Sequence, residues 1–334
     1  MRAARYFGPR DFRLVEVERP VPARGEVLLR VRAAGLCHSD LHIIYDELGG
    51  YPIPAPLTLG HEICGEAVEL GEGVSDIELG RRYAVFGPVG CGHCRYCRSG
   101  RDNLCSESRW MGIARDGGYA EYVTVPAQAL VPVPERVGDA EAAVATDAVL
   151  TSYHALVTLG RLEPGQGVAV IGVGGLGLNA VQIASALGAV VLVLDIDERK
   201  LELARQHGAA VVLDSRQLDP QKPPLDRPIS LVADFVGNDQ TKLLAQQLVE
   251  RGGRVVLVGL GSVGGPLAAL RDIAEEIAVL GSFWGTRLEL ATVLDLIARG
   301  IVRPRVETHP LDEILTWVER LRAGAVEGRV AFVP

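Results

Sequence analysis

Residues 167–195 read GVAVIGVGGLGLNAVQIASALGAVVLVLD, and this stretch decides the fold. An apolar run at each end flanks a Gly-rich turn and a segment whose apolar residues recur at helical spacing. The order strand, turn, helix, strand is typical of a parallel sheet covered by helices. We expect no membrane span here, because the glycines and Asn179, Gln182 and Ser185 leave no unbroken run of about 20 apolar residues.

The turn GVGGLG at 172–177 has the pattern G-x-G-x-x-G, which lets a pyrophosphate approach the backbone at a helix N-terminus. Asp195 ends the next strand, where a carboxylate hydrogen-bonds ribose hydroxyls and repels a 2'-phosphate. The pattern predicts a dinucleotide-binding unit that prefers NAD to NADP, although Arg199 and Lys200 nearby favour the opposite choice. The alternative is a purely structural turn with a capping Asp. The residues assigned to the coenzyme here are Gly172, Gly174, Gly175, Leu176, Gly177, Asp195 and Arg199.

The second half of the chain continues the alternation of strands and helices. Apolar strand patterns recur at 231–237 and 254–259, and helical patterns separate the predicted strands. The tail then shows helical spacing at 290–297 and 311–321. We therefore predict an α/β fold with a doubly wound parallel sheet from about residue 150 onward.

The first 130 or so residues show a different pattern of apolar and polar residues. Apolar residues alternate with arginines over 27–32, as in a half-buried strand, and further short strand patterns follow among loops. A Pro-punctuated strip at 130–143 separates this mostly β region from the second half. The two different sequence patterns indicate two domains, and a length of 334 residues also suggests two domains.

Composition and charge exclude several classes of protein. The hydrophobic share of 48% is too high for a disordered chain, and 39 Gly lack a collagen period. A net charge of -8 without a dense Lys/Arg run argues against nucleic acid as a partner. The N-terminus has no apolar stretch of the kind that secretory signals carry, so we expect a cytoplasmic protein without a membrane partner.

Four of the six cysteines form a C-x2-C-x2-C-x7-C pattern. In a cytosolic chain such crowding indicates a metal site rather than disulfides. Four thiolates close a tetrahedron around zinc and leave no open position, which is typical of a structural site. An iron–sulfur cluster also uses four cysteines and stays an alternative, whereas His93 within the loop reads as a surface residue. The predicted structural zinc ligands are Cys91, Cys94, Cys97 and Cys105.

A second set of possible metal ligands is dispersed. Cys37 lies in GLCHSDLH, and His61 lies 24 residues later in LTLGHEIC. A thiolate and an imidazole with a third ligand would leave one position open for water or substrate, as in catalytic zinc sites. The simpler reading of two such residues is a buried cysteine and a hydrogen-bonded histidine.

The string G-H-E-x2-G-x5-G-x2-V at 60–74 resembles the signature of zinc-containing medium-chain alcohol dehydrogenases. Cys37, Ser39, His42, the four-cysteine pattern, the Gly-rich turn and Asp195 follow in that family's order, so the resemblance covers essentially the whole chain. It implies a GroES-like catalytic domain at 1–149, with a structural zinc lobe near 91–105, to which the chain returns at 288–334. The Rossmann coenzyme-binding domain, 150–287, is inserted between.

The resemblance makes Cys37 and His61 ligands of a catalytic zinc. Many members have cysteine as the third ligand, but none of the six cysteines lies in ATDAVLTSYHAL, where Asp147 stands instead. This looks like the branch of bacterial secondary-alcohol dehydrogenases with a carboxylate ligand, and FWGTRLEL at 283–290 also resembles that branch. Carboxylate oxygen is an acceptable zinc ligand. The alternative for Asp147 is a carboxylate at a helix N-terminus.

Further roles follow from the resemblance alone. Ser39 would accept the alcohol proton and pass it through the nicotinamide ribose to His42, and Glu62 would approach the metal transiently. His38 would face the pyrophosphate, and Thr151 would lie near the nicotinamide. The implied reaction is reversible, zinc-dependent hydride transfer between NAD and a hydrophobic secondary alcohol and its ketone, in a homotetramer. The alternatives are a polyol or sugar dehydrogenase and a non-catalytic NAD- and zinc-binding sensor.

Overall fold

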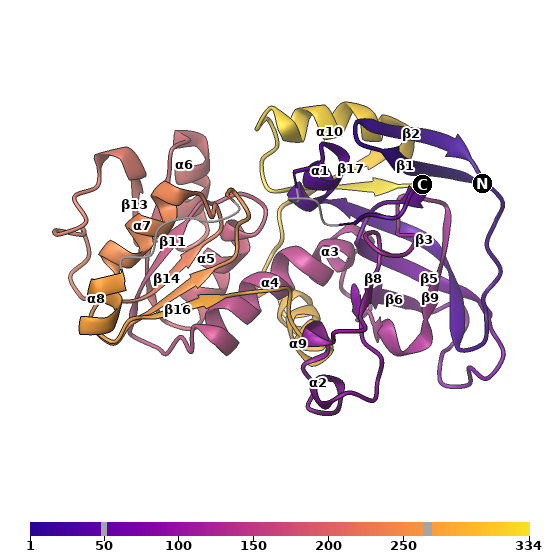
Figure 1. Ribbon diagram of the computed structural model, residues 1–334, viewed down its shortest axis with the longest axis horizontal. Coiled ribbons are helices and arrows are strands. Elements are labelled where there is room, and N and C mark those ends of the chain that lie inside the picture. The colour runs from indigo at the N-terminus through magenta and orange to yellow at the C-terminus, as the bar shows by residue number, and fades with distance from the viewer. Residues whose placement is uncertain (48–51, 263–268) are drawn as a thin grey trace. The chain divides into compact units, whose positions relative to one another are not determined.

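The computed structural model describes residues 1–47, 52–262 and 269–334 (Figure 1). The chain divides into two compact units, and it leaves the first unit and later returns to it. The first unit contains Met1–Leu150, Thr286–Gly300 and Pro304–Pro334; the second contains Thr151–Gly285 and Ile301–Arg303.

The first unit is built on a seven-stranded sheet with the order β10-β6-β5-β3-β18-β17, in which β9 also pairs with β3. Residues 27–32 lie in β3, and Arg30 and Arg32 are exposed while their apolar neighbours are buried, as the alternation predicts. The strands of this sheet are β3 (Glu26–Leu36), β5 (Glu62–Leu70), β6 (Arg82–Val85), β9 (Tyr122–Pro126), β10 (Leu130–Pro132), β17 (Val306–Pro310) and β18 (Arg329–Val333). Smaller sheets join β2 (Asp11–Glu16), β1 (Arg2–Gly8) and β4 (Leu57–Thr58), and β7 (Pro88–Val89) and β8 (Arg109–Trp110).

The last strand of the chain belongs to the middle of this sheet. β18 pairs antiparallel with β3, with Val330 opposite Leu36. The residue that starts β18, Arg329, is thereby brought next to the end of β3, where Cys37 follows. The helices and helical turns of the unit are α1 (His38–Ile44), α2 (Arg95–Arg98), η1 (Asp102–Leu104), η2 (Ala127–Ala129), α3 (Asp139–Val144), the π-helical η3 (Ala145–Val149), α9 (Arg287–Ala298), η6 (Leu311–Glu313) and α10 (Ile314–Arg322).

The second unit is a six-stranded parallel sheet with the order β13-β12-β11-β14-β15-β16. Counted from β11, this is the doubly wound order 3-2-1-4-5-6 of a dinucleotide-binding unit. α5 packs on β11 and β12, α6 on β12 and β13, and α7 on β14 and β15 (Figure 1). The strands are β11 (Gly167–Ile171), β12 (Val190–Asp195), β13 (Val211–Asp214), β14 (Ile229–Asp234), β15 (Arg254–Leu257) and β16 (Ala278–Gly281). The helices and turns are η4 (His154–Leu159), α5 (Gly177–Ala186), α6 (Glu198–Gln206), η5 (Ser215–Gln217), α7 (Asp239–Leu248) and α8 (Ala269–Ala274), and α4 (Leu150–Tyr153) joins the two units.

Burial explains why the strands of the second unit read as nearly continuous apolar runs. All five residues of β11 are buried, and so are the four central residues of β12. A parallel sheet covered on both faces has no solvent-facing side on which polar residues would alternate. The predicted strand, turn, helix and strand over 167–195 are confirmed.

One helical stretch among the described residues, 139–159, is long and apolar enough to cross a membrane by length and composition alone. In its most apolar window, 78% of the residues are buried inside the protein. Such burial is also typical of a core helix.

Candidate active site and metal centres

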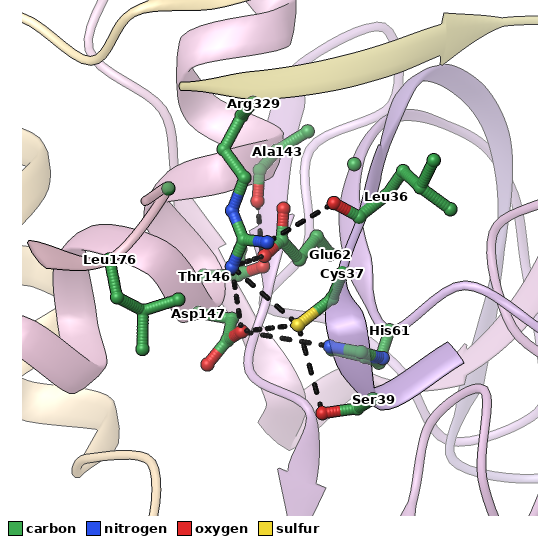
Figure 2. Close-up of polar contacts among 12 residues, drawn as sticks. Leu36, Cys37, Ser39, His61, Glu62, Ala143, Thr146, Asp147, Leu176 and Arg329 are labelled. Atoms are coloured by element: carbon green, nitrogen blue, oxygen red, sulfur yellow. Dashed lines mark hydrogen bonds and ion pairs between the residues drawn. The ribbon is translucent and has the colours of Figure 1, made fainter. Parts of the chain in front are cut away.

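Four potential metal ligands meet in the first unit, although they come from distant parts of the chain. Cys37, His61, Glu62 and Asp147 each offer one ligand atom, and these atoms all lie within 4.8 Å of one another (Figure 2). We call these four residues the buried cluster, because all of them are buried. Asp147 Oδ2 is 3.4 Å from Cys37 Sγ and 3.7 Å from His61 Nε2.

Two neighbouring strands supply half of the buried cluster. Cys37 lies between the end of β3 and the start of α1, and Glu62 is the first residue of β5. β3 and β5 are antiparallel partners, with Gly35 opposite Glu62. His61 immediately precedes β5, so the hydrogen-bonded register of the two strands brings the thiol and the imidazole together.

Asp147 comes from a π-helical turn, η3, within the helical stretch 139–159. π-helical turns are rare and often lie at functional sites. The alternative that Asp147 caps a helix N-terminus is wrong, because the helical stretch already begins at Asp139. Its carboxylate instead faces the thiol of Cys37 and the ring of His61 (Figure 2).

Arg329 is a central member of this site that sequence reasoning missed. Its Nη2 is 2.9 Å from Glu62 Oε1, 3.3 Å from Asp147 Oδ2 and 3.6 Å from Cys37 Sγ. Its Nη1 donates a hydrogen bond to the carbonyl of Leu36 at 3.1 Å. The guanidinium is only 4% exposed. No motif marks Arg329, because only the pairing of β18 with β3 brings it here.

The buried ionisable groups of this site shift one another's pKa values. Burial raises the pKa of Glu62 well above its usual range, and the nearby Arg329 guanidinium opposes that rise. Burial lowers the pKa of His61, but Asp40 and Asp147 outweigh it and hold that pKa well above the ordinary value. Burial likewise lowers the pKa of Arg329, but nearby acidic groups, Glu62 first among them, raise it by more. The ionisable groups of this site therefore interact strongly with one another within one buried space.

The donor atoms of the buried cluster suit zinc. A cysteine sulfur, a histidine nitrogen and a carboxylate oxygen are the three kinds of ligand that Zn²⁺ takes in proteins. Three such protein ligands with one open position are typical of catalytic zinc sites. The chemistry of Cys37, His61 and Asp147 therefore fits a catalytic zinc ion.

Asp40 and Tyr119 support Cys37 and His61 of the buried cluster. Asp40 Oδ1 is 3.7 Å from His61 Nδ1. Asp40 Oδ2 accepts hydrogen bonds from the backbone N–H of Cys37 at 3.0 Å and from the hydroxyl of Tyr119 at 2.7 Å. Both side chains are fully buried. A carboxylate at the far nitrogen of a ligand histidine orients the ring and fixes its tautomer.

The predicted proton-transfer residues lie on α1. Ser39 Oγ is 3.7 Å from Cys37 Sγ, so the hydroxyl reaches the buried cluster (Figure 2). His42 lies in the last turn, where its Nδ1 is 3.1 Å from Glu47 Oε2. Residues three apart on a helix share a face, so Ser39 and His42 are neighbours along α1. His38 is exposed at the first position of α1.

The four predicted cysteines also meet, in a loop region that we call the cysteine lobe (Cys91, Cys94, Cys97 and Cys105). Backbone N–H groups donate to three of the sulfurs: Cys91 to Cys105, Cys94 to Cys91 and Cys97 to Cys94, at 3.3 to 3.5 Å. The pKa of Cys94 is lowered to about 7, and the hydrogen bond from the backbone N–H of Cys97 is the largest cause. Burial raises the pKa of Cys97 to about 12. A complete set of four sulfurs fits a structural zinc ion.

The Gly-rich turn in the second unit has the geometry that its pattern predicts. Gly172 has φ +82°, which L side chains rarely adopt. A Cβ on Gly177 would lie 1.9 Å from the carbonyl oxygen of Gly172, so only glycine lets the helix approach this closely. A Cβ on Gly174 would meet nothing within 4 Å, which leaves open space beside the backbone. Leu176 is the N-cap residue of α5. The turn therefore fits a coenzyme pyrophosphate.

Asp195 holds this turn in place. Its Oδ2 accepts a hydrogen bond from the N–H of Val173 at 2.8 Å, and its Oδ1 accepts from Ile196 and Asp197 at 2.7 and 3.0 Å. Arg199 Nη2 is paired with Asp197 Oδ2 at 2.9 Å, which offsets the charge of the guanidinium. Thr151 is buried at the start of the second unit.

Comparison with known proteins gives a consistent result. Residues 23–135 match the alcohol dehydrogenase GroES-like domain, and residues 175–299 match the zinc-binding dehydrogenase family. An alcohol dehydrogenase of Geobacillus stearothermophilus is 38% identical over 322 residues, which cover 95% of this chain and 94% of that protein.

Solved structures agree in fold as well as in sequence. An acetophenone reductase from Geotrichum candidum NBRC 4597, solved in complex with NAD, has a TM-score of 0.92 and 42% identity, covering 100% of this chain and 97% of that one. The alcohol dehydrogenase of the archaeon Aeropyrum pernix has a TM-score of 0.92 and 35% identity over all of both chains.

A Rossmann unit inserted into a GroES-like domain, with two sets of zinc-type donors, defines the class of zinc-dependent oxidoreductases. The chain belongs to the zinc-containing medium-chain alcohol dehydrogenase family. The predicted family, fold class and enzyme class are confirmed, and the alternative of a non-catalytic sensor is set aside.

Proposed function

We propose that this enzyme catalyses the reversible, NAD-linked oxidation of a hydrophobic secondary alcohol to its ketone, with one catalytic and one structural zinc per chain. The observation that carries the proposal is the buried meeting of Cys37, His61 and Asp147, because these residues supply the three kinds of donor that a catalytic zinc takes. The substrate class rests on the likeness to an acetophenone reductase at 42% identity.

The ligands of the catalytic zinc are Cys37, His61 and Asp147. When bound, the zinc lowers the pKa of an alcohol as a Lewis acid, and NAD supplies the hydride acceptor. The thiolate and the carboxylate offset the charge of the ion. Glu62 lies beside these three ligands. Because its carboxylate is paired with Arg329 at 2.9 Å, we assign Glu62 as a transient ligand of the zinc.

Proton transfer is assigned to α1. Ser39 Oγ accepts the proton of the alcohol and releases its own hydroxyl proton toward His42, because its hydroxyl lies at the edge of the buried cluster, 3.7 Å from Cys37 Sγ. His42, one turn further along α1, delivers that proton to solvent. The carboxylate of Glu47, 3.1 Å from His42 Nδ1, orients the imidazole ring.

Coenzyme binding is assigned to residues of the second unit and to His38 of the first. The pyrophosphate binds at the Gly-rich turn, and Asp195 binds the ribose hydroxyls. The pairing of Arg199 with Asp197 supports NAD over NADP, because a guanidinium already offset by a carboxylate attracts a 2'-phosphate less. Thr151 is assigned to the nicotinamide and His38 to the pyrophosphate. The coenzyme residues of the turn are Gly172, Gly174, Gly175, Leu176 and Gly177.

The remaining assignments concern organisation. We assign 1–149 and 288–334 to the catalytic domain, 150–287 to the coenzyme domain, and the structural zinc to the cysteine lobe. A homotetramer in the cytoplasm is proposed from the family resemblance. Light scattering tests the oligomeric state, and a monomer would contradict it.

A matched pair of alcohols tests the substrate and coenzyme together. Zinc-replete enzyme is offered 1-phenylethanol and benzyl alcohol, and sorbitol as a polyol, each with NAD and with NADP, and reduced coenzyme is followed by absorbance. The proposal predicts the highest kcat/KM for 1-phenylethanol with NAD. Preference for benzyl alcohol would overturn the secondary-alcohol assignment, and turnover of sorbitol alone would favour the polyol alternative.

A further inference from the structure

A second group of donor atoms lies on the outside of the cysteine lobe and shares one cysteine with it. One ligand atom each from Cys91, His93 and Glu107 lies within 4.8 Å of the others. The side chains of His93 and Glu107 are 67% and 62% exposed, whereas Cys105 on the inner side of the lobe is buried. Cys91 therefore connects a solvent-facing set of donors to an inner one.

The hydrogen bonding of His93 fixes which ring nitrogen can bind a cation. His93 Nδ1 is 3.0 Å from the backbone carbonyl oxygen of Cys91. Because a carbonyl oxygen only accepts, Nδ1 carries the hydrogen, and in the neutral ring the lone pair is on Nε2. A backbone carbonyl that holds the far nitrogen is also the usual support of a metal-binding histidine.

Two lone-pair groups then face each other on the surface. His93 Nε2 is 3.5 Å from Glu107 Oε1. Nitrogen and oxygen ligands at about 2.0 to 2.2 Å from a tetrahedral zinc would lie about 3.4 Å apart. The observed separation fits this geometry, with Cys91 Sγ as the third donor and solvent at the fourth position.

We propose that Cys91, His93 and Glu107 form an outer Zn²⁺ site through which zinc enters and leaves the cysteine lobe. The proposal rests on the structural zinc proposed above. An incoming ion exchanges bound water for the three donors. It then exchanges His93, Glu107 and the solvent ligand for Cys94, Cys97 and Cys105, while Cys91 stays bound and any thiol protons pass to water. No oxidation or reduction is involved.

Metal exchange in the intact holoenzyme tests this proposal. Cadmium uptake is followed by the cadmium–thiolate absorbance, to which the lobe contributes four thiolates and the catalytic site one, and zinc release is followed with a chromogenic indicator. With the outer site, the exchange rate rises with free Cd²⁺, and His93→Asn and Glu107→Gln each slow it by about tenfold, as the loss of one supporting group does in metal sites. Both side chains are exposed, so both variants keep the fold.

Glu78→Gln is the matched control, because Glu78 is a similarly exposed carboxylate of the same unit that pairs with Arg81. It exchanges metal at the wild-type rate. An exchange rate that does not depend on free Cd²⁺, or wild-type rates in both test variants, would overturn the outer site. Metal analysis of the wild type and of Cys105→Ser separates the two proposals: the same zinc content in both overturns the structural zinc itself, whereas a lobe zinc lost in Cys105→Ser with unchanged exchange rates in the test variants overturns only the outer site.

Discussion

The buried cluster and the cysteine lobe each gather four metal-binding side chains, but from very different lengths of chain. The lobe takes its cysteines from residues 91–105, whereas Cys37 and Asp147 in the buried cluster are 110 residues apart. Three of the lobe cysteines are partly exposed, and all residues of the buried cluster are buried. The lobe sulfurs accept from backbone N–H groups, whereas the buried cluster depends on the side chains of Arg329 and Asp40.

This difference separates two tasks that zinc can perform. A local set of four thiolates needs little support beyond its own loop and closes around the ion, so it stabilises structure. A mixed set drawn from distant elements needs the whole domain to hold it, and it leaves a position for substrate. Changes in the two sites should therefore act on different properties of the enzyme.

The largest effects are expected from one variant in each site, Asp147→Asn in the buried cluster and Cys105→Ser in the cysteine lobe. Asp147→Asn should lower kcat by more than about 100-fold, which exceeds the usual cost of losing a supporting group, with little change in Tm. Cys105→Ser should lower Tm, because structural zinc binding contributes directly to folding free energy. Zinc content, kcat and Tm of both variants are the measurements. Full zinc and full activity in Asp147→Asn would remove it from the ligand set.

The next largest effect concerns Arg329. Arg329→Met leaves Glu62 buried without its ion-pair partner at 2.9 Å, and such a loss costs about 3–5 kcal/mol of unfolding free energy. Denaturant unfolding measures this loss. The double variant Arg329→Met with Glu62→Gln is the control and should recover part of it, because no uncompensated charge then remains. Equal stability of the single variant and the wild type would show that the ion pair does not support the buried cluster.

A smaller effect is expected from the hydroxyl of Tyr119, which donates to Asp40 at 2.7 Å. Tyr119→Phe should speed loss of the catalytic zinc to a chelator by about tenfold, while loss of the structural zinc is unchanged. Tyr83→Phe is the control, because Tyr83 is also buried and its hydroxyl accepts from the backbone N–H of Glu78. The same acceleration in both variants would indicate a general loss of stability instead of a role at His61.

The smallest effect is a difference in thiol reactivity within the zinc-free lobe. Since the pKa of Cys94 is lowered to about 7 and that of Cys97 is raised to about 12, Cys94 is half thiolate near neutral pH. Iodoacetamide should therefore modify Cys94 first, faster as the pH rises through 7. Peptide mass spectrometry at several pH values measures the order, and prior modification of Cys97 would contradict it.

Local patterns could be predicted from the sequence. The cysteine spacing, the Gly-rich turn and Asp195 lie in short segments, and the confirmed strand, turn and helix over 167–195 follow from periodicity alone. Arg329 could not be predicted, because its place depends on a strand pairing across 293 residues. The π-helical turn that presents Asp147 also lacks a sequence pattern, since ordinary helical spacing describes its neighbours equally well.

Anomalous scattering from crystals of the zinc-replete enzyme tests the central claim most directly. The account predicts two zinc peaks per chain, one of them within about 2.0–2.3 Å of Cys37 Sγ, His61 Nε2 and an oxygen of Asp147. A single peak in the cysteine lobe, with Asp147 paired only to Arg329, would contradict the account.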